Sequence, residues 1–70
     1  MLALRELEVF RLIGQGQTTL QISQNLHLSS SAVDTYRLRI REKLGLKTGT
    51  ELTYRAICWV ESASRQNYQI

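Results

Sequence analysis

The chain has 70 residues, of which 43% are hydrophobic and 21% are charged, and its formal net charge is +3. This length allows one domain, near the lower limit of what folds unaided. No apolar run approaches the ~20 residues of a membrane span, and no signal-peptide pattern is present. The single cysteine, Cys58, excludes an internal disulfide and fits a reducing cytoplasm, and the mild positive charge is a weak indication of a polyanionic partner.

The first predicted helix extends from about Leu4 to Ile13. Its apolar residues, at helical spacing, are Leu4, Leu7, Val9, Phe10, Leu12 and Ile13. Gly14 and Gly16 follow, and either can adopt the positive φ at which helices end, so we interpret this pair as a helix stop.

The second predicted helix is short and begins at a capping box. Thr18 and Gln21 have the spacing at which each side chain satisfies a free N–H at a helix start. The helix continues to about Leu26 and buries either Leu20 or Ile22 together with Leu26. His27 then lies in a tight connection to the next helix.

The third predicted helix, residues 29–44, begins with three consecutive serines that precede its apolar run, and Ser29 is the preferred cap. Its apolar stripe is Val33, Tyr36, Ile40 and Leu44. Gly45 follows the stripe, where a helix favours a left-handed residue. Because only about three residues separate it from the second helix, the two predict a helix-turn-helix.

Positive charge is concentrated in residues 37–47. This segment has five basic residues and one glutamate, a net charge of +4, whereas the remainder has four basic and five acidic residues, a net charge of −1. The basic residues are Arg37, Arg39, Arg41, Lys43 and Lys47. A solvated helix face is the ordinary interpretation of such a run. Within a helix-turn-helix it favours a helix that lies in the DNA major groove.

The fourth predicted helix starts at a second capping box, Thr48 with Glu51, and extends to about Ser62. Its core stripe is Leu52, Ala56, Trp59 and Ala63, flanked by Val60. Residues 65–70 have no periodicity and are expected to fray, which divides the chain into a domain of residues 1–64 and a tail of residues 65–70. The architecture expected is all-α, with four helices.

A second, largely apolar side of the fourth helix is formed by Tyr54, Ile57, Cys58 and Glu61. These residues could cover another part of the same chain or form a partner surface. Because so small a domain cannot easily bury both sides of its last helix, we favour a dimer interface.

Candidate DNA-binding residues come from the presumed outer face of the third helix and from helix starts. Thr35 and Leu38 point most directly away from the apolar stripe, and Leu38 could meet a thymine methyl group. Asp34 could accept a hydrogen bond from cytosine, or it could simply stabilise the first turn or pair with Arg37. The full set is Thr18, Thr19, Ser29, Ser30, Asp34, Thr35, Arg37, Leu38, Arg39, Arg41, Lys43 and Lys47.

Catalytic and metal-binding constellations are missing from the sequence. One histidine, His27, and one cysteine, Cys58, make neither a metal site nor an activated nucleophile, and no glycine pattern fits a phosphate loop. We therefore expect no enzymatic activity, no metal and no cofactor.

The combined motifs resemble the LuxR/FixJ-type (NarL/GerE-type) DNA-binding domain of bacterial transcription regulators, over Leu2 to about Val60. Residues 5–10, Arg-Glu-Leu-Glu-Val-Phe, match the family's opening Arg-Glu-x-Glu-Val-Leu. Residues 12–18 and 22–23 match its Leu-Ile-Ala-x-Gly-x-Ser and Ile-Ala patterns. Residues 29–36 and 40–45 match its Ser-x-x-Thr-Val-x-x-His and Ile-x-x-Lys-Leu-Gly patterns.

Four positions depart from that family's pattern. Ala3 replaces the capping Thr or Ser, which removes a cap worth ~1 kcal/mol, and Tyr36 replaces a common His. Gly49 stands where the family often has Arg, and Asp34 where some members carry a DNA-binding Lys. These departures limit the transfer of individual base contacts.

The resemblance implies a module that binds double-stranded promoter DNA as a homodimer, with the third helix in the major groove and the fourth supplying the dimer contact. It also implies an N-terminal regulatory domain, often a phosphorylated receiver, a cytoplasmic setting at the bacterial nucleoid, and a possible contact with RNA polymerase. Two alternatives remain: the promoter-reading end of a sigma factor, which would not need dimerisation, and a protein-interaction module whose basic face binds an acidic protein.

Overall fold

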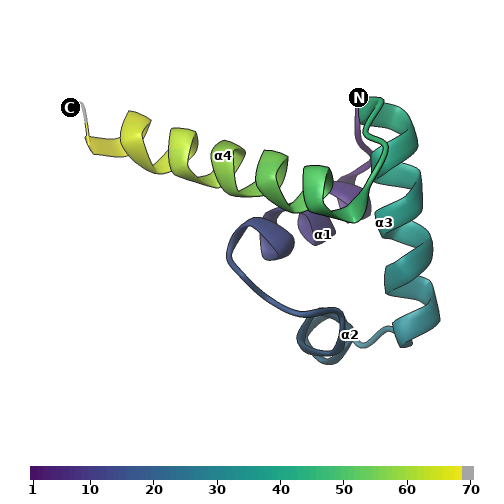
Figure 1. The fold of residues 1–70 in the computed structure, drawn as a ribbon. Coiled ribbons are helices and arrows are strands. Elements are labelled where there is room, and N and C mark those ends of the chain that lie inside the picture. Colours follow the sequence, from purple (N-terminus) through teal and green to yellow (C-terminus); the bar gives the residue numbers. More distant parts are fainter. Residues whose placement is uncertain (69–70) are drawn as a thin grey trace.

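A computed structural model of the protein describes the backbone of residues 1–68 and the side chains of residues 1–63. It consists of four helices joined by short links: α1 (Leu4–Gly14), α2 (Thr19–Leu26), α3 (Ser30–Leu44) and α4 (Gly49–Tyr68) (Figure 1). Residues 1–68 contain no strand. The expected all-α, four-helix architecture is confirmed, and the predicted starts of all four helices agree with the structure to within one residue.

The last helix is longer than predicted. α4 was expected to end near Ser62, but it continues to Tyr68, and its C-terminal part extends away from the other three helices (Figure 1). After Gly49 the chain contains neither glycine nor proline, so nothing in the sequence stops the helix. The backbone of residues 65–68 therefore continues α4, and residues 69–70 lie outside the described part. The division into a domain of residues 1–64 and a frayed tail of residues 65–70 stays a prediction.

A small core forms where α1 contacts each of the other helices. Its buried hydrophobic members are Val9, Phe10, Ile13, Ile22, Val33, Ile40, Leu52 and Ala56. Of the two candidates in α2, Ile22 is the buried one and Leu20 is 60% exposed.

Parts of the predicted apolar stripes lie at the surface. Leu4 and Leu7 are exposed because a spacing of three residues drifts around a helix that has 3.6 residues per turn. The face of α1 that is buried instead comprises Glu6, Val9, Phe10 and Ile13. In α4, Trp59 is 40% exposed and Ala63 is exposed, because α4 has by then passed beyond most of the core.

The predicted capping boxes of α2 and α4 are both present. Gln21 N–H donates to Thr18 Oγ1 over 3.2 Å, and Gln21 Oε1 accepts from Thr18 N–H over 2.9 Å. Thr48 and Glu51 repeat this arrangement at α4, with both distances 3.1 Å. These reciprocal bonds satisfy N–H groups that a helix start leaves free, so short sequence signals fixed both starts.

Gly14 has a role beyond ending α1, because it lies inside the helix where α1 crosses α4. A Cβ at this position would meet the backbone oxygen of Ala56 and would lie 2.6 Å from Val60 Cγ2. The turn itself is provided by Gly16, whose φ is +87°. Gly14 therefore permits the close approach of the two helices.

We expect Gly14→Ala to destabilise the domain by about 1–3 kcal/mol, the usual cost of overpacking, despite the better helix propensity of alanine. Chemical denaturation of both proteins measures the difference in free energy of unfolding. Gly49→Ala is the matched control, since a Cβ there would have nothing within 4 Å. Equal stability of Gly14→Ala and wild type would contradict the tight crossing.

Candidate nucleic-acid interface

The link between α2 and α3 is a compact, hydrogen-bonded turn. His27 adopts the left-handed conformation, with φ 56° and ψ 44°, which confirms it as a turn residue. The backbone N–H groups of His27 and Leu28 both donate to Ser23 O, and the Leu28 bond is 2.9 Å long. Ser29 Oγ then accepts from Ala32 N–H over 3.1 Å and caps α3, as predicted. The two helices form a helix-turn-helix.

α3 buries one side and exposes the other. Val33 and Ile40 are fully buried, whereas Asp34, Thr35, Leu38 and Arg39 are exposed. At the end of the helix, Gly45 has a φ of +68°, and Leu46 N–H donates to Arg41 O over 2.8 Å. The exposed residues show that the outer side of α3 is not covered by the rest of the described chain.

Thr35 and Leu38 lie on this outer side, as the sequence predicts. Leu38 is 51% exposed, and an exposed leucine alone is common on protein surfaces, so only its place on the helix-turn-helix makes it a candidate base contact. Thr35 Oγ1 donates to Ser31 O over 3.0 Å. That bond uses the hydroxyl proton and leaves the oxygen able to accept from an external donor.

The five basic residues of residues 37–47 have different environments. Arg39 and Lys47 are exposed, while Arg37 is half-buried beside the start of α4. The guanidinium of Arg41 donates to Lys47 O and so holds the α3–α4 link. The ammonium of Lys43 pairs with Glu6 of α1, 2.7 Å from Oε1. Two of the five side chains are therefore already engaged within the domain.

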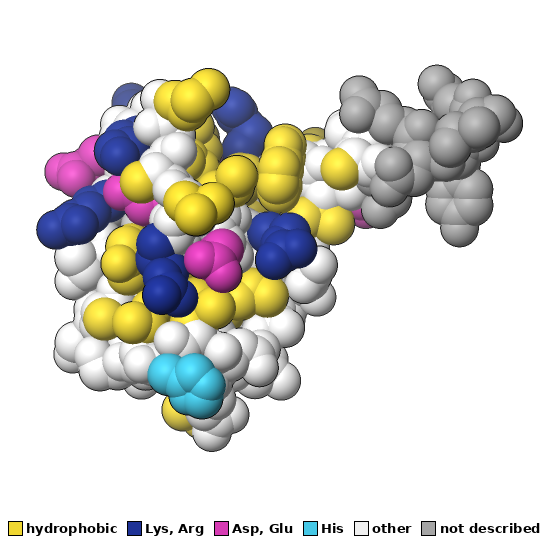
Figure 2. Space-filling view, turned by 180° about the vertical axis from the view of Figure 1, so that it is seen from behind, with side chains coloured by type: hydrophobic (Ala, Val, Ile, Leu, Met, Phe, Trp, Pro, Cys, Tyr) yellow, Lys and Arg dark blue, Asp and Glu magenta, His cyan; other side chains and the backbone are white. Residues whose placement is uncertain are grey.

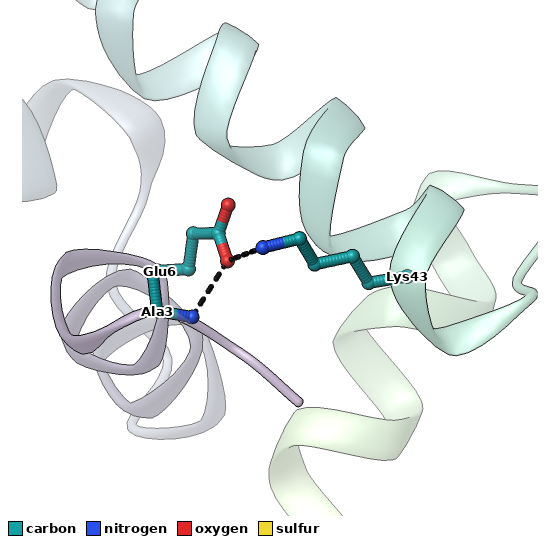
Figure 3. A network of polar contacts seen from close by, with 3 residues as sticks. All are labelled: Ala3, Glu6 and Lys43. Carbon is teal, nitrogen blue, oxygen red and sulfur yellow. Dashed lines mark hydrogen bonds and ion pairs between the residues drawn. The ribbon is translucent and has the colours of Figure 1, made fainter.

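Glu6 is a buried carboxylate that joins α1 to the end of α3 (Figure 3). Its Oε1 accepts from Lys43 Nζ over 2.7 Å and from Ala3 N–H over 2.8 Å. The hydrogen bond from Lys43, followed by that from Ala3, lowers the pKa of Glu6 below its usual value of 4.5. Ala3 supplies no side-chain cap, so only the Glu6 half of the capping box of α1 is made.

The sequence itself indicates that Glu6 lies on the buried face of α1. Glu6 precedes Val9, Phe10 and Ile13 by three, four and seven residues, which is the spacing of one helix face. A carboxylate on a buried face needs a partner charge or several hydrogen bonds. The pattern predicts that Glu6 is paired, but not which of the basic residues pairs with it.

The remaining candidate DNA-binding residues lie at helix starts. Thr18, Ser29 and Ser30 are exposed, and Thr19 is half-buried. Thr18 and Ser29 are the caps of α2 and α3. Capping does not prevent these groups from binding phosphate, because helix N-termini combine free N–H groups with a positive dipole end.

The side of α4 predicted as a dimer interface lies at the surface. Tyr54 is 70% exposed and Ile57 36% exposed, Glu61 is exposed and Cys58 is half-buried. Hydrogen bonding to Cys58 raises the pKa of Tyr54 above 10, and the charge of Glu61 adds to this effect. Tyr54 and Ile57 line a hollow together with Arg37 of α3, so this side of α4 is partly covered within the described residues, and self-association stays a prediction.

Among the described residues, no group of three or more His, Cys, Asp or Glu side chains could hold a metal ion. Among the described helices, none is long and apolar enough to cross a membrane.

Comparison with known proteins gives matches over most of the chain. Residues 1–56 match the family described as bacterial regulatory proteins, LuxR family. The response regulator UvrY of Escherichia coli is 39% identical over 66 residues, which cover 89% of this chain and 30% of UvrY. The uncharacterized response regulatory protein YgeK of Escherichia coli is 42% identical over 53 residues, covering 76% of this chain and 36% of YgeK. The chain thus spans about a third of these relatives, and no solved structure matches it significantly.

The Glu6–Lys43 pair predicts a pH-dependent stability. Because the folded-state pKa of Glu6 is lowered, its stabilising contribution is complete above the usual carboxyl range and is lost as the pH falls below about 4.5. Glu6→Gln should lower the free energy of unfolding at pH 7, and its difference from wild type should shrink on acidification.

Denaturation at pH 7 and at successively lower pH measures this difference. Glu8→Gln is the matched control, since Glu8 pairs with Arg5 only at the surface, over 3.9 Å. Such exposed pairs contribute about 0–1 kcal/mol. A Glu6→Gln difference that stays constant between pH 7 and pH 3 would contradict the charged pair.

Proposed function

The chain belongs to the LuxR family of bacterial regulatory proteins, and we propose that it recognises a specific promoter sequence with its recognition helix, residues 29–44, in the DNA major groove. The observation that carries this proposal is the outer side of α3. Asp34, Thr35, Leu38 and Arg39 are exposed there, opposite fully buried Val33 and Ile40. A major groove about 12 Å wide admits a helix presented in this way.

Sequence is read by Thr35 and Leu38, with Asp34, Arg39 and Arg41 at their flanks. An arginine that makes a bidentate contact with guanine contributes ~1–3 kcal/mol of discrimination, so Arg39 is the strongest single candidate. Arg41 also holds the α3–α4 link, which restricts its reach. Leu38 suits a thymine methyl group.

Phosphate contacts fix the position of the domain on DNA. Basic side chains and helix starts supply such contacts without reading sequence. The residues proposed for this role are Thr18, Thr19, Ser29, Ser30, Arg37, Lys43 and Lys47. Because Lys43 is paired with Glu6, we expect it to contribute less than Lys47.

We propose further that the domain is the effector part of a two-component response regulator. Two relatives carry the name response regulator or response regulatory protein, and each is about three times as long as the matched segment. An N-terminal receiver domain would then control a protein that acts in the cytoplasm, at the bacterial nucleoid, and contacts RNA polymerase at the promoter.

The function is tested by selecting bound duplexes from a random pool. We expect wild type to enrich one motif, and Thr35→Ala and Leu38→Ala each to change base preference at particular positions while circular dichroism stays unchanged. Gln15→Ala, an exposed change outside the helix-turn-helix, is the control and should select the wild-type motif. A wild-type pool without enrichment would favour a protein-interaction module, and unchanged motifs for both variants would exclude this reading surface.

Salt dependence tests the phosphate contacts. Lys47→Gln should reduce the slope of log K against log salt concentration by ~0.9, the value for one lost phosphate contact. Replacing both members of the internal pair, Glu6→Gln with Lys43→Gln, should reduce the slope by less than Lys47→Gln does, because Lys43 is paired with Glu6. Titration of a selected duplex at several salt concentrations measures both. If the salt slope of the double variant falls by as much as that of Lys47→Gln, Lys47 is not the stronger phosphate contact of the two lysines.

Dimerisation through Tyr54, Ile57, Cys58 and Glu61 is the remaining part of the proposal. A two-fold contact on one helix is small, and contacts below ~1,200 Å² are weak, so pairing would occur on DNA with half-sites about one helical turn apart. Ile57→Asp should abolish cooperative occupancy of a paired site and leave single half-site affinity nearly intact. Cooperativity that survives Ile57→Asp combined with Tyr54→Ala would show that the dimer contact is elsewhere or does not exist.

A further inference from the structure

A second exposed apolar surface lies on α1 and the middle of α4. It consists of Leu4, Leu7 and Trp59, which are 79%, 37% and 40% exposed, and is called here the Trp59 patch. In Figure 2, hydrophobic side chains gather on the face where α4 leaves the body of the domain, with Lys and Arg side chains at their border. The proposed contacts with DNA and with a second copy of the chain do not involve Leu4, Leu7 or Trp59.

The patch is shaped by two neighbouring hollows that share Leu7 and Trp59. One hollow is completed by Leu2, Phe10, Leu44 and Arg55. The other is completed by Leu4, Glu8 and Arg11. The indole of Trp59 packs on Phe10, with ring centroids 5.6 Å apart, so a buried aromatic residue holds it in place. Ordered tryptophans and arginines beside apolar hollows are the residue types that dominate binding energy at protein interfaces.

The charges around the patch are predominantly positive. Arg55 borders one hollow and Arg11 the other, and both are exposed. The ion pairs of the described residues join Arg5 to Glu8 and Lys43 to Glu6, so neither Arg11 nor Arg55 has a carboxylate partner there. Glu8, the acidic residue of the second hollow, is already paired. The rim therefore offers two cationic groups to a partner.

We propose that the Trp59 patch binds an amphipathic helix of a partner protein, one whose apolar stripe is flanked by acidic residues. Two adjacent hollows suit apolar anchors at i, i+3 or i+4, and i+7 of a helix, and the described chain has no strand edge that an extended peptide could join. The rim arginines select the acidic flanks. A second copy of this chain fits less well, because a two-fold contact through the patch would bring the same arginines together.

The probe is a synthetic peptide of about 15 residues, with leucines at i, i+3, i+4 and i+7 and glutamates between them. Trp59 is the only tryptophan of the chain, so its fluorescence reports on the patch directly. We expect a saturable change in Trp59 emission on titration. A peptide with lysines in place of glutamates should bind about tenfold or more weakly. Adding a selected DNA duplex should not displace the acidic peptide, because DNA occupies α3.

Variants locate the binding site. Leu4→Asp should weaken the acidic peptide by about tenfold or more without unfolding the domain, since Leu4 is 79% exposed. Ile57→Asp is the matched control on the other side of α4 and should leave peptide affinity unchanged. Arg11→Glu combined with Arg55→Glu should reverse the preference between the two peptides. Circular dichroism verifies that each variant is folded.

The proposal is overturned if the acidic peptide causes no saturable change in Trp59 emission, or if the acidic and basic peptides bind with equal affinity. It is also overturned if DNA displaces the acidic peptide, or if Leu4→Asp binds this peptide as tightly as wild type does. A concentration-dependent change of Trp59 emission without peptide, lost in Leu4→Asp, would also overturn it, because the occupant would then be a second copy of the chain.

Discussion

The structure depends on how α3 is held: one side has to be buried so that the opposite side can remain free. Val33 and Ile40 are fully buried in the core formed around α1, and contacts at both ends then fix the helix. The left-handed His27 and the Ser29 cap define where α3 begins, and the Lys43–Glu6 pair ties its last turn to α1. These contacts hold the exposed residues of α3 in a fixed orientation before DNA arrives, which reduces the entropy lost on binding.

The same contacts divide the basic residues into two groups. Counting charges in the sequence gives residues 37–47 a net +4, but Glu6 offsets Lys43, and Arg41 holds the α3–α4 link. Arg39 and Lys47 remain exposed, and Arg37 is half-buried. The positive field available to a polyanion is therefore smaller than the count indicates. Most of the attraction to DNA should therefore come from the exposed basic side chains, Arg39 and Lys47.

Features that depend on neighbours along the chain could be predicted, including the helix starts, the capping boxes and the turn at His27, because short-range hydrogen bonds determine them. The exposed positions of Thr35 and Leu38 followed from the stripe of α3. Contacts between distant segments could not be predicted: Gly14 against Ala56, or Glu6 with Lys43, depends on how helices cross. The spacing of apolar residues also predicted burial wrongly at three positions. Leu4, Leu7 and Ala63 fit a helical pattern but lie outside the core.

The most direct test of the central claim, that the outer side of α3 reads the major groove, is atomic substitution in a selected duplex. N7 of purines faces the major groove and N3 of adenine the minor groove. We predict that 7-deazapurines weaken binding at positions within one major groove per half-site, and that 3-deazaadenine at the same positions has little effect. Loss of affinity with 3-deazaadenine but not with any 7-deazapurine would contradict it.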